Sequence, residues 1–383
     1  MSNVTDLLLG VIRSEVCGKE FLPTSLGDGE LEELFRLSKE QDMVHIVGAW
    51  ATKLGLADGE LGERLTKAHM MAVYRYQQIT FELKRISAIL ERNKIKYIPL
   101  KGSVIRSLYP SAWMRTSCDI DILVSEDELD RAIGCLVSEA KYTTDGARAY
   151  HDVSLYAPSG VHLELHFNIL ENAEQMDGVL SRVWEHAQPR SGEYGYAQTP
   201  EFLMFHQIAH AAYHFRGGGC GLRPVLDIWL LKEKTVIDGD ALESLLREAG
   251  LLFFAESILD LGDAWFGDGE HTDLTRKMES FILGAYIYGS AENRIAVEKS
   301  KRGGSLGYVL NRLFMPYKFM KIKYPVLKKC PILLPFCHIA RWSGLLLPKK
   351  RRQAATELKQ TREITDEKAE KVSSLCRELD LKF

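Results

Sequence analysis

The sequence predicts an α+β protein in which a small mixed sheet lies between two helical regions. Apolar residues recur every three or four positions before residue 92 and again after residue 199, as in amphipathic helices. Between these regions, short apolar runs are separated by turn residues, which is typical of strands. With 383 residues, 46% of them hydrophobic, the chain can build two or three packed units. We divide it into an N-terminal helical region (1–92), an α/β core (93–198), a helical domain (199–298) and a basic, aromatic-rich helical extension and tail (299–383).

The core is expected to begin with an extended segment at 97–100 that turns into a short helix ending near residue 108. Residues 119–124 form the next predicted strand, with its isoleucines on one face and Asp119 and Asp121 on the other. Ser125 and Glu128 have the spacing of a capping box, so we expect Ser125 to cap the helix that follows. Residues 151–157 and 161–168 are predicted as a hairpin joined by Pro158-Ser159-Gly160.

Helical periodicity returns after residue 199. We predict helices over 201–215, 222–232 and from 242 to about 265. The apolar run from 331 to 347 is interrupted by proline, histidine and arginine, which disfavours a membrane span.

The paired aspartates are the first candidate for chemistry. Two residues apart on a strand, Asp119 and Asp121 have Cα atoms roughly 6.6 Å apart and project the same way. Both carboxylates can then reach one point, as hard divalent cations with oxygen ligands require. A lone Asp-x-Asp is a weak signal, because short acidic pairs are common.

The second strand of the hairpin reads His162-Leu163-Glu164-Leu165-His166, so its polar side chains share one face. That face either meets solvent or lines a cleft. If this strand lies beside residues 119–124, Glu164 becomes a third carboxylate that binds a metal or accepts a proton.

Upstream, Gly102 and Ser103 stand at the predicted helix start, where backbone amides favour phosphate oxygens. Lys101 and Arg115 add positive charge nearby. The alternative for Gly102-Ser103 is an ordinary helix cap.

Taken together, these residues resemble the uncharacterised nucleotidyltransferase family of the DNA polymerase beta-like superfamily. The motifs that carry the resemblance are Lys101-Gly102-Ser103, Arg115-x-x-x-Asp119-Ile120-Asp121, Glu164-Leu165-His166, His206-x-x-x-His210 and Leu222-Arg223-Pro224-x-x-Asp227. They extend over most of the chain. Fifteen residues separate Ser103 from Asp119, slightly more than the superfamily's usual interval, which weakens the phosphate role of Ser103.

The resemblance implies a nucleotidyltransferase core in which Asp119, Asp121 and Glu164 hold Mg²⁺ or Mn²⁺ on a nucleoside triphosphate such as ATP. It assigns the phosphate-binding turn to Gly102 and Ser103, and we expect the positive charges of Lys101 and Arg115 to contribute to nucleotide binding. A hydroxyl of an acceptor attacks the α-phosphorus, and pyrophosphate leaves.

The implied acceptor is a sugar, a glycan precursor or another small molecule, because such proteins are common near bacterial polysaccharide-biosynthesis genes. A protein hydroxyl and a tRNA end stay open. The alternative function is a catalytically silent binding or regulatory module, such as a toxin–antitoxin component.

His206, His210 and His214 recur every four residues on one helix face. A zinc site is the weaker interpretation, because no acidic or cysteine ligand has matching spacing. We instead expect His166, His210, Arg223 and Asp227 to line a substrate cleft.

Residues 299–352 contain fourteen Lys or Arg and no Asp or Glu, interleaved with aromatic side chains. Such a block suits an anionic membrane surface or another polyanion, nucleic acid included, or it merely solvates a helical subdomain. Seven scattered cysteines and a start without an export signal place the protein in the cytoplasm, with peripheral attachment to the inner membrane face as an open option.

Overall fold

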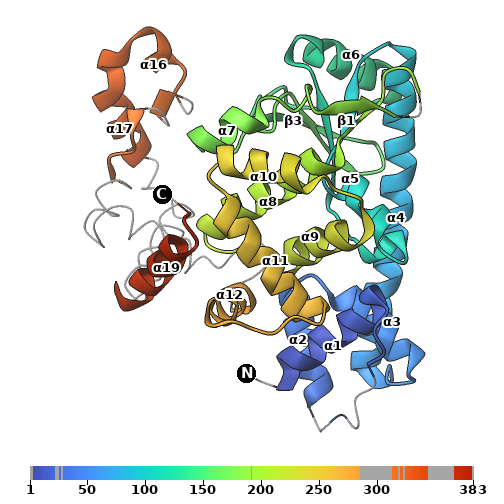
Figure 1. The fold of residues 1–383 in the computed structure, drawn as a ribbon. Coiled ribbons are helices and arrows are strands. Elements are labelled where there is room, and N and C mark those ends of the chain that lie inside the picture. Colours follow the sequence, from blue (N-terminus) through green and yellow to red (C-terminus); the bar gives the residue numbers. More distant parts are fainter. Residues whose placement is uncertain are drawn as a thin grey trace. The chain divides into compact units, whose positions relative to one another are not determined.

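The computed structural model describes residues 3–21, 26, 29–190, 192–284, 313–317, 320–321, 324–343 and 366–381. The chain divides into two compact units, Met1–Tyr213 with Cys220–Ile287, and His214–Gly219 with Tyr288–Phe383. The larger unit holds a four-stranded mixed sheet, a two-stranded sheet and most of the described helices, so the predicted α+β class is confirmed (Figure 1). The four-part domain division stays a prediction.

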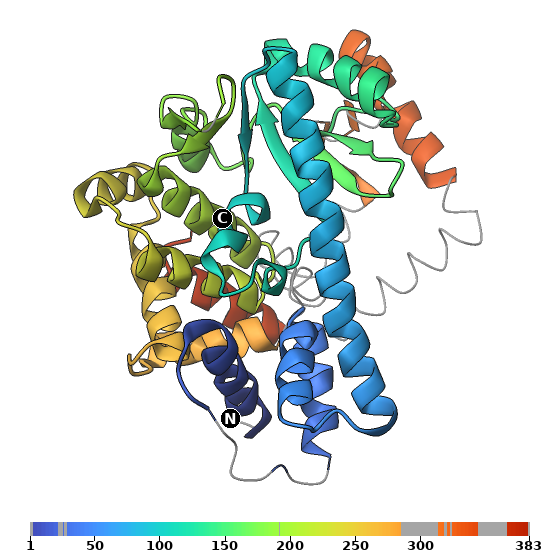
Figure 2. The same cartoon turned by 90° about the vertical axis from the view of Figure 1, so that its right-hand side faces the viewer.

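The N-terminal region of the larger unit is helical. Its elements are α1 (Asn3–Cys17), α2 (Glu30–Glu40), α3 (Val44–Lys53) and α4 (Gly59–Arg92). Helix α4 is 34 residues long and runs from the N-terminal helices to the sheet (Figure 2). One continuous helix thus connects the N-terminal region to the sheet that carries the candidate site.

The main sheet has the strand order β1-β2-β4-β3. Its strands are β1 (Tyr97–Pro99), β2 (Asp119–Val124), β3 (Asp152–Tyr156) and β4 (His162–His166). Strands β3 and β4 form the predicted antiparallel hairpin, and β1 is antiparallel to β2. Strand β4 pairs in parallel with β2, with α6 (Leu129–Ala140) and β3 between them in sequence. The sheet is therefore mixed, as predicted.

The apolar face of the sheet forms the core with α4 and α6. Ile120, Ile122, Leu163 and Leu165 are fully buried there, together with Ile86 and other residues of the two helices. Because side chains alternate along each strand, the polar residues of β2 and β4 are left on the opposite face.

The remaining described elements of the larger unit connect the sheet to a helical region. They are α5 (Gly102–Ile105), η1 (Arg106–Leu108), η2 (Ala112–Met114), η3 (Glu126–Glu128), α7 (Glu174–Leu180), β5 (Ala187–Pro189), β6 (Tyr196–Gln198), α8 (Pro200–Arg216), α9 (Leu222–Lys234), α10 (Gly239–Glu248), α11 (Leu252–Phe266) and α12 (Asp273–Leu283).

Two local predictions were wrong. Ser125 makes no side-chain cap, because the chain first forms the 3-10 turn η3 and α6 begins only at Leu129. The single helix predicted from 242 to about 265 is two helices, α10 and α11. Gly250 between them has φ +67°, a left-handed conformation that ends a helix, and the amide of Leu251 donates to the carbonyl of Leu246.

The smaller unit contains the described helices α16 (Val326–Lys329), η4 (Pro331–Leu333), α17 (Leu334–Ser343) and α19 (Asp366–Glu378). Met320, Leu327 and Cys337 are buried together in it. Much of the basic block 299–352 lies outside the described residues, so its predicted polyanion contact stays a prediction.

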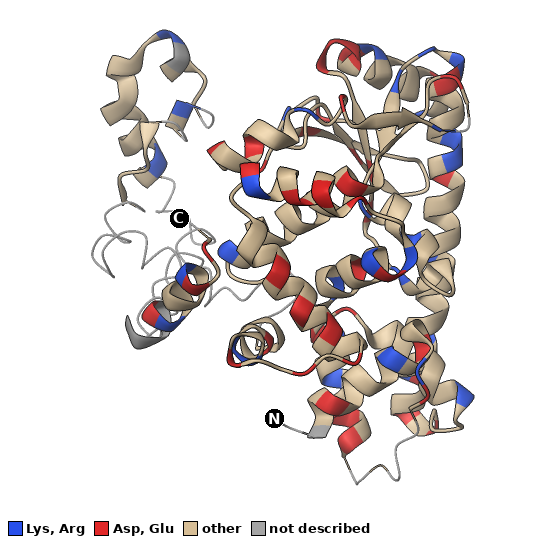
Figure 3. Cartoon of the chain, in the orientation of Figure 1, with Lys and Arg blue, Asp and Glu red and all other residues tan. Residues whose placement is uncertain are grey.

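Charged side chains are unevenly spread over the larger unit. Acidic residues recur on α10 and α11, and basic residues mark α4 (Figure 3). Among the described residues, no helix has the length and apolar character needed to cross a bilayer.

Candidate active site

Two parallel strands bring the three predicted carboxylates together. In the register of β2 and β4, Asp119 lies opposite His162 and Asp121 opposite Glu164. Paired residues of adjacent strands project to the same face, so these four side chains and His166 form one polar surface. The strand that carries Glu164 therefore lies beside residues 119–124. This was the condition for Glu164 to join the two aspartates.

The apolar residues between them fix this orientation. A one-residue slip of β4 against β2 would turn Leu163 and Leu165 outward and press Glu164 into the core. Burying one such side chain contributes about 1.5–3 kcal/mol, so the two leucines together favour the observed register by roughly 3–6 kcal/mol.

His166 lies between two of the carboxylates. Its Nε2 is 3.0 Å from Asp121 Oδ1 and 3.5 Å from Glu164 Oε2, and its ring stacks on His151 at a centroid distance of 5.2 Å. Burial alone would lower the pKa of His166, but the hydrogen bonds to Asp121 and Glu164 raise it above its ordinary value. His166 is thus a part of the carboxylate cluster, and its predicted place in a substrate cleft stays a prediction.

Lys101 contacts the same aspartate. Its Nζ donates to Asp121 Oδ1 at 2.9 Å, and its backbone has φ +46° and ψ −122°, a strained conformation for a residue other than glycine. Burial by itself would lower the pKa of Lys101, but the charge of Asp121 and their hydrogen bond raise it. The ammonium is therefore a fixed positive charge beside the cluster.

The two aspartates differ in their electrostatic surroundings. Burial would raise the pKa of Asp121, but the charge of Lys101 and the hydrogen bond from His166 hold it well below its usual range. For Asp119, burial and the negative charges of Asp121 and Glu164 raise the pKa, and the charge of Lys101 offsets them only in part. Negative charge on the Asp119 side of the cluster is thus less compensated, which favours a cation there.

The donor atoms of this face fit a divalent metal ion. Within the described residues, two groups have ligand atoms that all lie within 4.8 Å of one another. They are Asp119, His162 and Glu164, and Asp121, Glu164 and His166. Carboxylate oxygens suit Mg²⁺ and Mn²⁺, and imidazole nitrogens suit transition metals.

The turn between β1 and α5 also borders the site. The amide of Ser103 donates to the carbonyl of Leu100 within the turn, whereas the Ser103 hydroxyl is buried with no hydrogen-bond partner. A Cβ atom at Gly102 would lie 3.3 Å from Arg115 Nη1 and 3.4 Å from the Cβ of Ser117, so a side chain would be crowded there. In this turn, the unsatisfied polar group is a hydroxyl and not the Ser103 amide.

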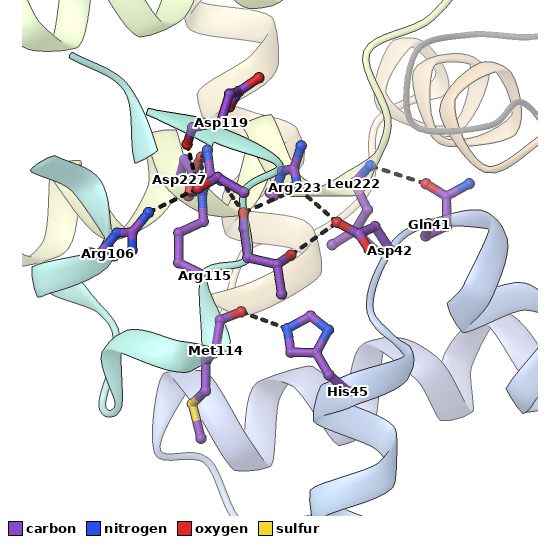
Figure 4. Close-up of polar contacts among 12 residues, drawn as sticks. Gln41, Asp42, His45, Arg106, Met114, Arg115, Asp119, Leu222, Arg223 and Asp227 are labelled. Atoms are coloured by element: carbon purple, nitrogen blue, oxygen red, sulfur yellow. Dashed lines mark hydrogen bonds and ion pairs between the residues drawn. The ribbon is translucent and has the colours of Figure 1, made fainter. Parts of the chain in front are cut away.

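Arg115 is anchored by helix α9. Its Nε lies 2.9 Å from both carboxylate oxygens of Asp227 on α9, its Nη2 lies 2.8 Å from Asp227 Oδ2, and its Nη1 donates to the carbonyl of Thr116 (Figure 4). The Tyr109 hydroxyl donates to Asp227 Oδ1 at 2.8 Å. Arg115 and Asp227 are both buried, so this contact joins α9 to the segment that leads into Asp119. A phosphate contact by Arg115 stays a prediction.

A second ion pair holds the same segment from the N-terminal region. Arg223 Nη1 lies 2.8 Å from Asp42 Oδ2, and the Thr116 hydroxyl donates to the same oxygen at 2.9 Å (Figure 4). Arg223 also donates to the Thr116 carbonyl. The structure thus places Arg223 and Asp227 behind the loop before β2, where they position it; their predicted place in a substrate cleft stays a prediction.

Sequence reasoning missed Arg106. This buried arginine donates from Nε to the carbonyl of Gly102 and from Nη2 to the hydroxyl of Ser117, which in turn donates to the carbonyl of Asp119. Burial and the neighbouring charge of Arg115 lower the pKa of Arg106 to about 10. The spacing of four residues between Gly102 and Arg106, typical of one helix turn, was the available signal.

His162 was also left out of the predicted site, although it shares the strand face with Glu164 and His166. Strict alternation in the sequence His-Leu-Glu-Leu-His was sufficient to include it.

The histidines of α8 are held by side chains from outside the sheet. His210 Nδ1 lies 2.7 Å from Glu171 Oε1, and His206 Nδ1 lies within hydrogen-bond distance of the Gln198 side chain. Burial and the positive charge of Lys101 lower the pKa of His210 to about 3. His210 is therefore a neutral imidazole near neutral pH, within electrostatic reach of the cluster.

Comparison with known families gives the class of the protein, the nucleotidyltransferases. A family model described as "Uncharacterised nucleotidyltransferase" matches residues 28–267, more than half of the chain, and the protein belongs to this family. The resemblance seen in the sequence is thereby confirmed. Nucleotidyl transfer is its general activity, and a nucleoside triphosphate is the substrate that the family implies. No curated protein and no solved structure gives a significant match.

Proposed function

We propose that the protein is a metal-dependent enzyme that moves a nucleoside monophosphate from a triphosphate, such as ATP, to a hydroxyl acceptor. The observation that carries the proposal is the parallel register of β2 and β4, which sets Glu164 beside Asp121 and next to Asp119. Paired carboxylates with a third carboxylate beside them suit a divalent ion and the phosphates that it binds.

Within this proposal, Asp119, Asp121 and Glu164 would hold Mg²⁺ or Mn²⁺, which would neutralise charge on the phosphates and on the departing pyrophosphate. The hydroxyl oxygen of the acceptor forms a bond to the α-phosphorus while the bond from that phosphorus to the pyrophosphate oxygen breaks. The hydroxyl proton passes to water, or to Glu164, which is half-buried beside the aspartates, where this carboxylate does not bind the ion.

The chain's other polar groups bind and orient the triphosphate. Lys101 adds a positive charge, and the Ser103 hydroxyl is a buried donor without a partner. Gly102 lets the turn lie close to Arg115. The pairs Arg115–Asp227 and Arg223–Asp42 position the segment that leads into Asp119, and His210 lies within electrostatic reach of the cluster.

For the acceptor, we propose a hydroxyl on a sugar, a glycan precursor or another small molecule, with a protein hydroxyl as the second choice. A role in polysaccharide biosynthesis, a cytoplasmic location and attachment of residues 299–352 to an anionic membrane or another polyanion complete the proposal.

The test compares nucleotide binding and turnover in matched variants. Wild-type protein should bind a fluorescent triphosphate analogue in the presence of Mg²⁺ or Mn²⁺, and it should release pyrophosphate when a mixture of hydroxyl acceptors is supplied. Asp119→Asn combined with Asp121→Asn should abolish release and weaken metal-dependent binding. Asp127→Asn, which changes an exposed aspartate three residues after the end of β2, is the control and should behave as wild type.

Binding of the triphosphate analogue that is unchanged without the metal ion and in the variant with both substitutions would contradict the proposed site. Metal-dependent binding without pyrophosphate release from any acceptor mixture, cell extract included, would instead favour the catalytically silent module.

A further inference from the structure

The polar face of β2 and β4 carries two ligand groups that share one residue. Asp119, His162 and Glu164 form the first group, and Asp121, Glu164 and His166 form the second. The register places Asp119 opposite His162 and Asp121 opposite Glu164, and His166 follows Glu164 two residues later on β4. Each group therefore has one imidazole in addition to its carboxylates.

The first histidine is oriented from outside the cluster. His162 Nε2 lies 3.0 Å from the hydroxyl of Ser154 on β3, and its ring stacks on Tyr156 at 4.8 Å. Histidines that bind metals commonly engage their second ring nitrogen in such a hydrogen bond, which fixes the ring. Because Ser154 contacts Nε2, Nδ1 is the nitrogen suited to an ion shared with Asp119 and Glu164.

The second histidine is enclosed. His166 is only 2% exposed, and its Nε2 is directed at both Asp121 and Glu164. Its Nδ1 is buried and has no hydrogen-bond partner among the described residues, so the neighbouring protein does not account for all the polar atoms of this ring. Stacking on His151 fixes the ring plane. Nε2 is thus the nitrogen that would bind an ion.

We propose that His162 and His166 each supply one imidazole nitrogen to the divalent ions of this face, with Glu164 shared between the two ligand groups. The inference deepens the proposed function, on which it rests. Mg²⁺ takes oxygen ligands almost exclusively, whereas Mn²⁺ accepts both oxygen and imidazole. The two groups therefore favour Mn²⁺, or another transition metal, over Mg²⁺.

Charge supports two ions. Lys101 contacts one of the three carboxylates with its ammonium, and a nucleoside triphosphate adds further negative charge. Lys101 contacts the same Asp121 oxygen as His166, so it competes with an ion in the second group. The first group, where Asp119 lacks such a contact among the described residues, should bind its ion more tightly.

The test is pulsed electron paramagnetic resonance on the full chain loaded with Mn²⁺ alone. Wild-type protein should bind two Mn²⁺ ions and show ¹⁴N modulation from imidazole. His162→Gln and His166→Gln should each reduce the stoichiometry from two to one or weaken one ion at least about tenfold, and the double variant should lose the ¹⁴N signal. His69→Gln on α4, outside both groups, is the control and should keep both ions and the signal.

Three results would overturn the inference. They are Mn²⁺ bound without ¹⁴N modulation, a wild-type ¹⁴N signal in the double variant whose circular dichroism shows that it is folded, and Mg²⁺ that displaces Mn²⁺ at equal concentration. Pyrophosphate release by wild-type protein in Mg²⁺ or Mn²⁺ is measured in parallel. Release without a nitrogen signal would reject only the histidine ligands, and a nitrogen signal without release would count against the proposed function instead.

Discussion

The buried pair Arg115–Asp227 predicts a large loss of stability when its negative charge is removed. Asp227→Asn keeps the shape of the side chain but leaves the guanidinium of Arg115 unpaired, and both residues are buried. Removing one partner of a buried ion pair costs about 3–5 kcal/mol. Because the amide oxygen still accepts one hydrogen bond, from Tyr109 or Arg115, we expect the lower end, about 3 kcal/mol.

The assay is urea unfolding at pH 7, with the free energy of unfolding obtained by linear extrapolation. Arg115→Met added to Asp227→Asn should recover part of the loss, because no buried charge then remains unpaired. Glu243→Gln is the matched control, since it breaks an exposed pair with Arg247 and should change stability far less.

Two results would refute this reasoning. One is an Asp227→Asn variant whose free energy of unfolding stays within about 1 kcal/mol of wild type, where an exposed pair would leave it. The other is a double variant less stable than Asp227→Asn alone. Since the pair holds the segment before Asp119, Asp227→Asn should also weaken triphosphate binding under conditions where the protein is folded.

Three further predictions concern glycines and pH. Gly102→Ala should weaken binding of a fluorescent triphosphate and lower the free energy of unfolding by about 1–3 kcal/mol, because the added Cβ would lie 3.3 Å from Arg115 Nη1. Unchanged binding and an unchanged free energy of unfolding would contradict this crowding. Gly250→Ala should cost about 1–2 kcal/mol in urea unfolding because φ is +67°, whereas Gly239→Ala, which meets open space, should be neutral or stabilising. The folded-state pKa of His210 is about 3, below its unfolded value near 6.5, so this residue's contribution to stability is complete above pH 6.5 and declines as the pH falls toward 3. The unfolding free energy measured between pH 6.5 and 4.5 should therefore vary less with pH in His210→Gln, by up to about 1.4 kcal/mol per pH unit, and an equal slope would contradict a half-buried neutral imidazole.

The sequence by itself determined the local elements and the faces that they present. Alternation of polar and apolar residues identified the strand 119–124, the hairpin that follows it and the polar side of each. The pattern is informative because only one face of such a strand can enter the core. Asp119, Asp121 and Glu164 could therefore be predicted as site residues before their strands were known to be neighbours.

Helix ends were less well determined. The break at Gly250 and the 3-10 turn after Ser125 depend on a few backbone dihedrals and hydrogen bonds, which apolar periodicity does not encode.

Only the tertiary structure decided which partners the charged residues take. In that structure β4 pairs in parallel with β2, and Lys101 contacts Asp121. Arg115 contacts Asp227, which lies 112 residues later in the chain. A lysine or arginine near a glycine turn looks alike in sequence whether it meets a phosphate or a buried carboxylate. The difference arises from contacts between segments far apart in the chain, whose energies depend on burial and distance and not on local spacing.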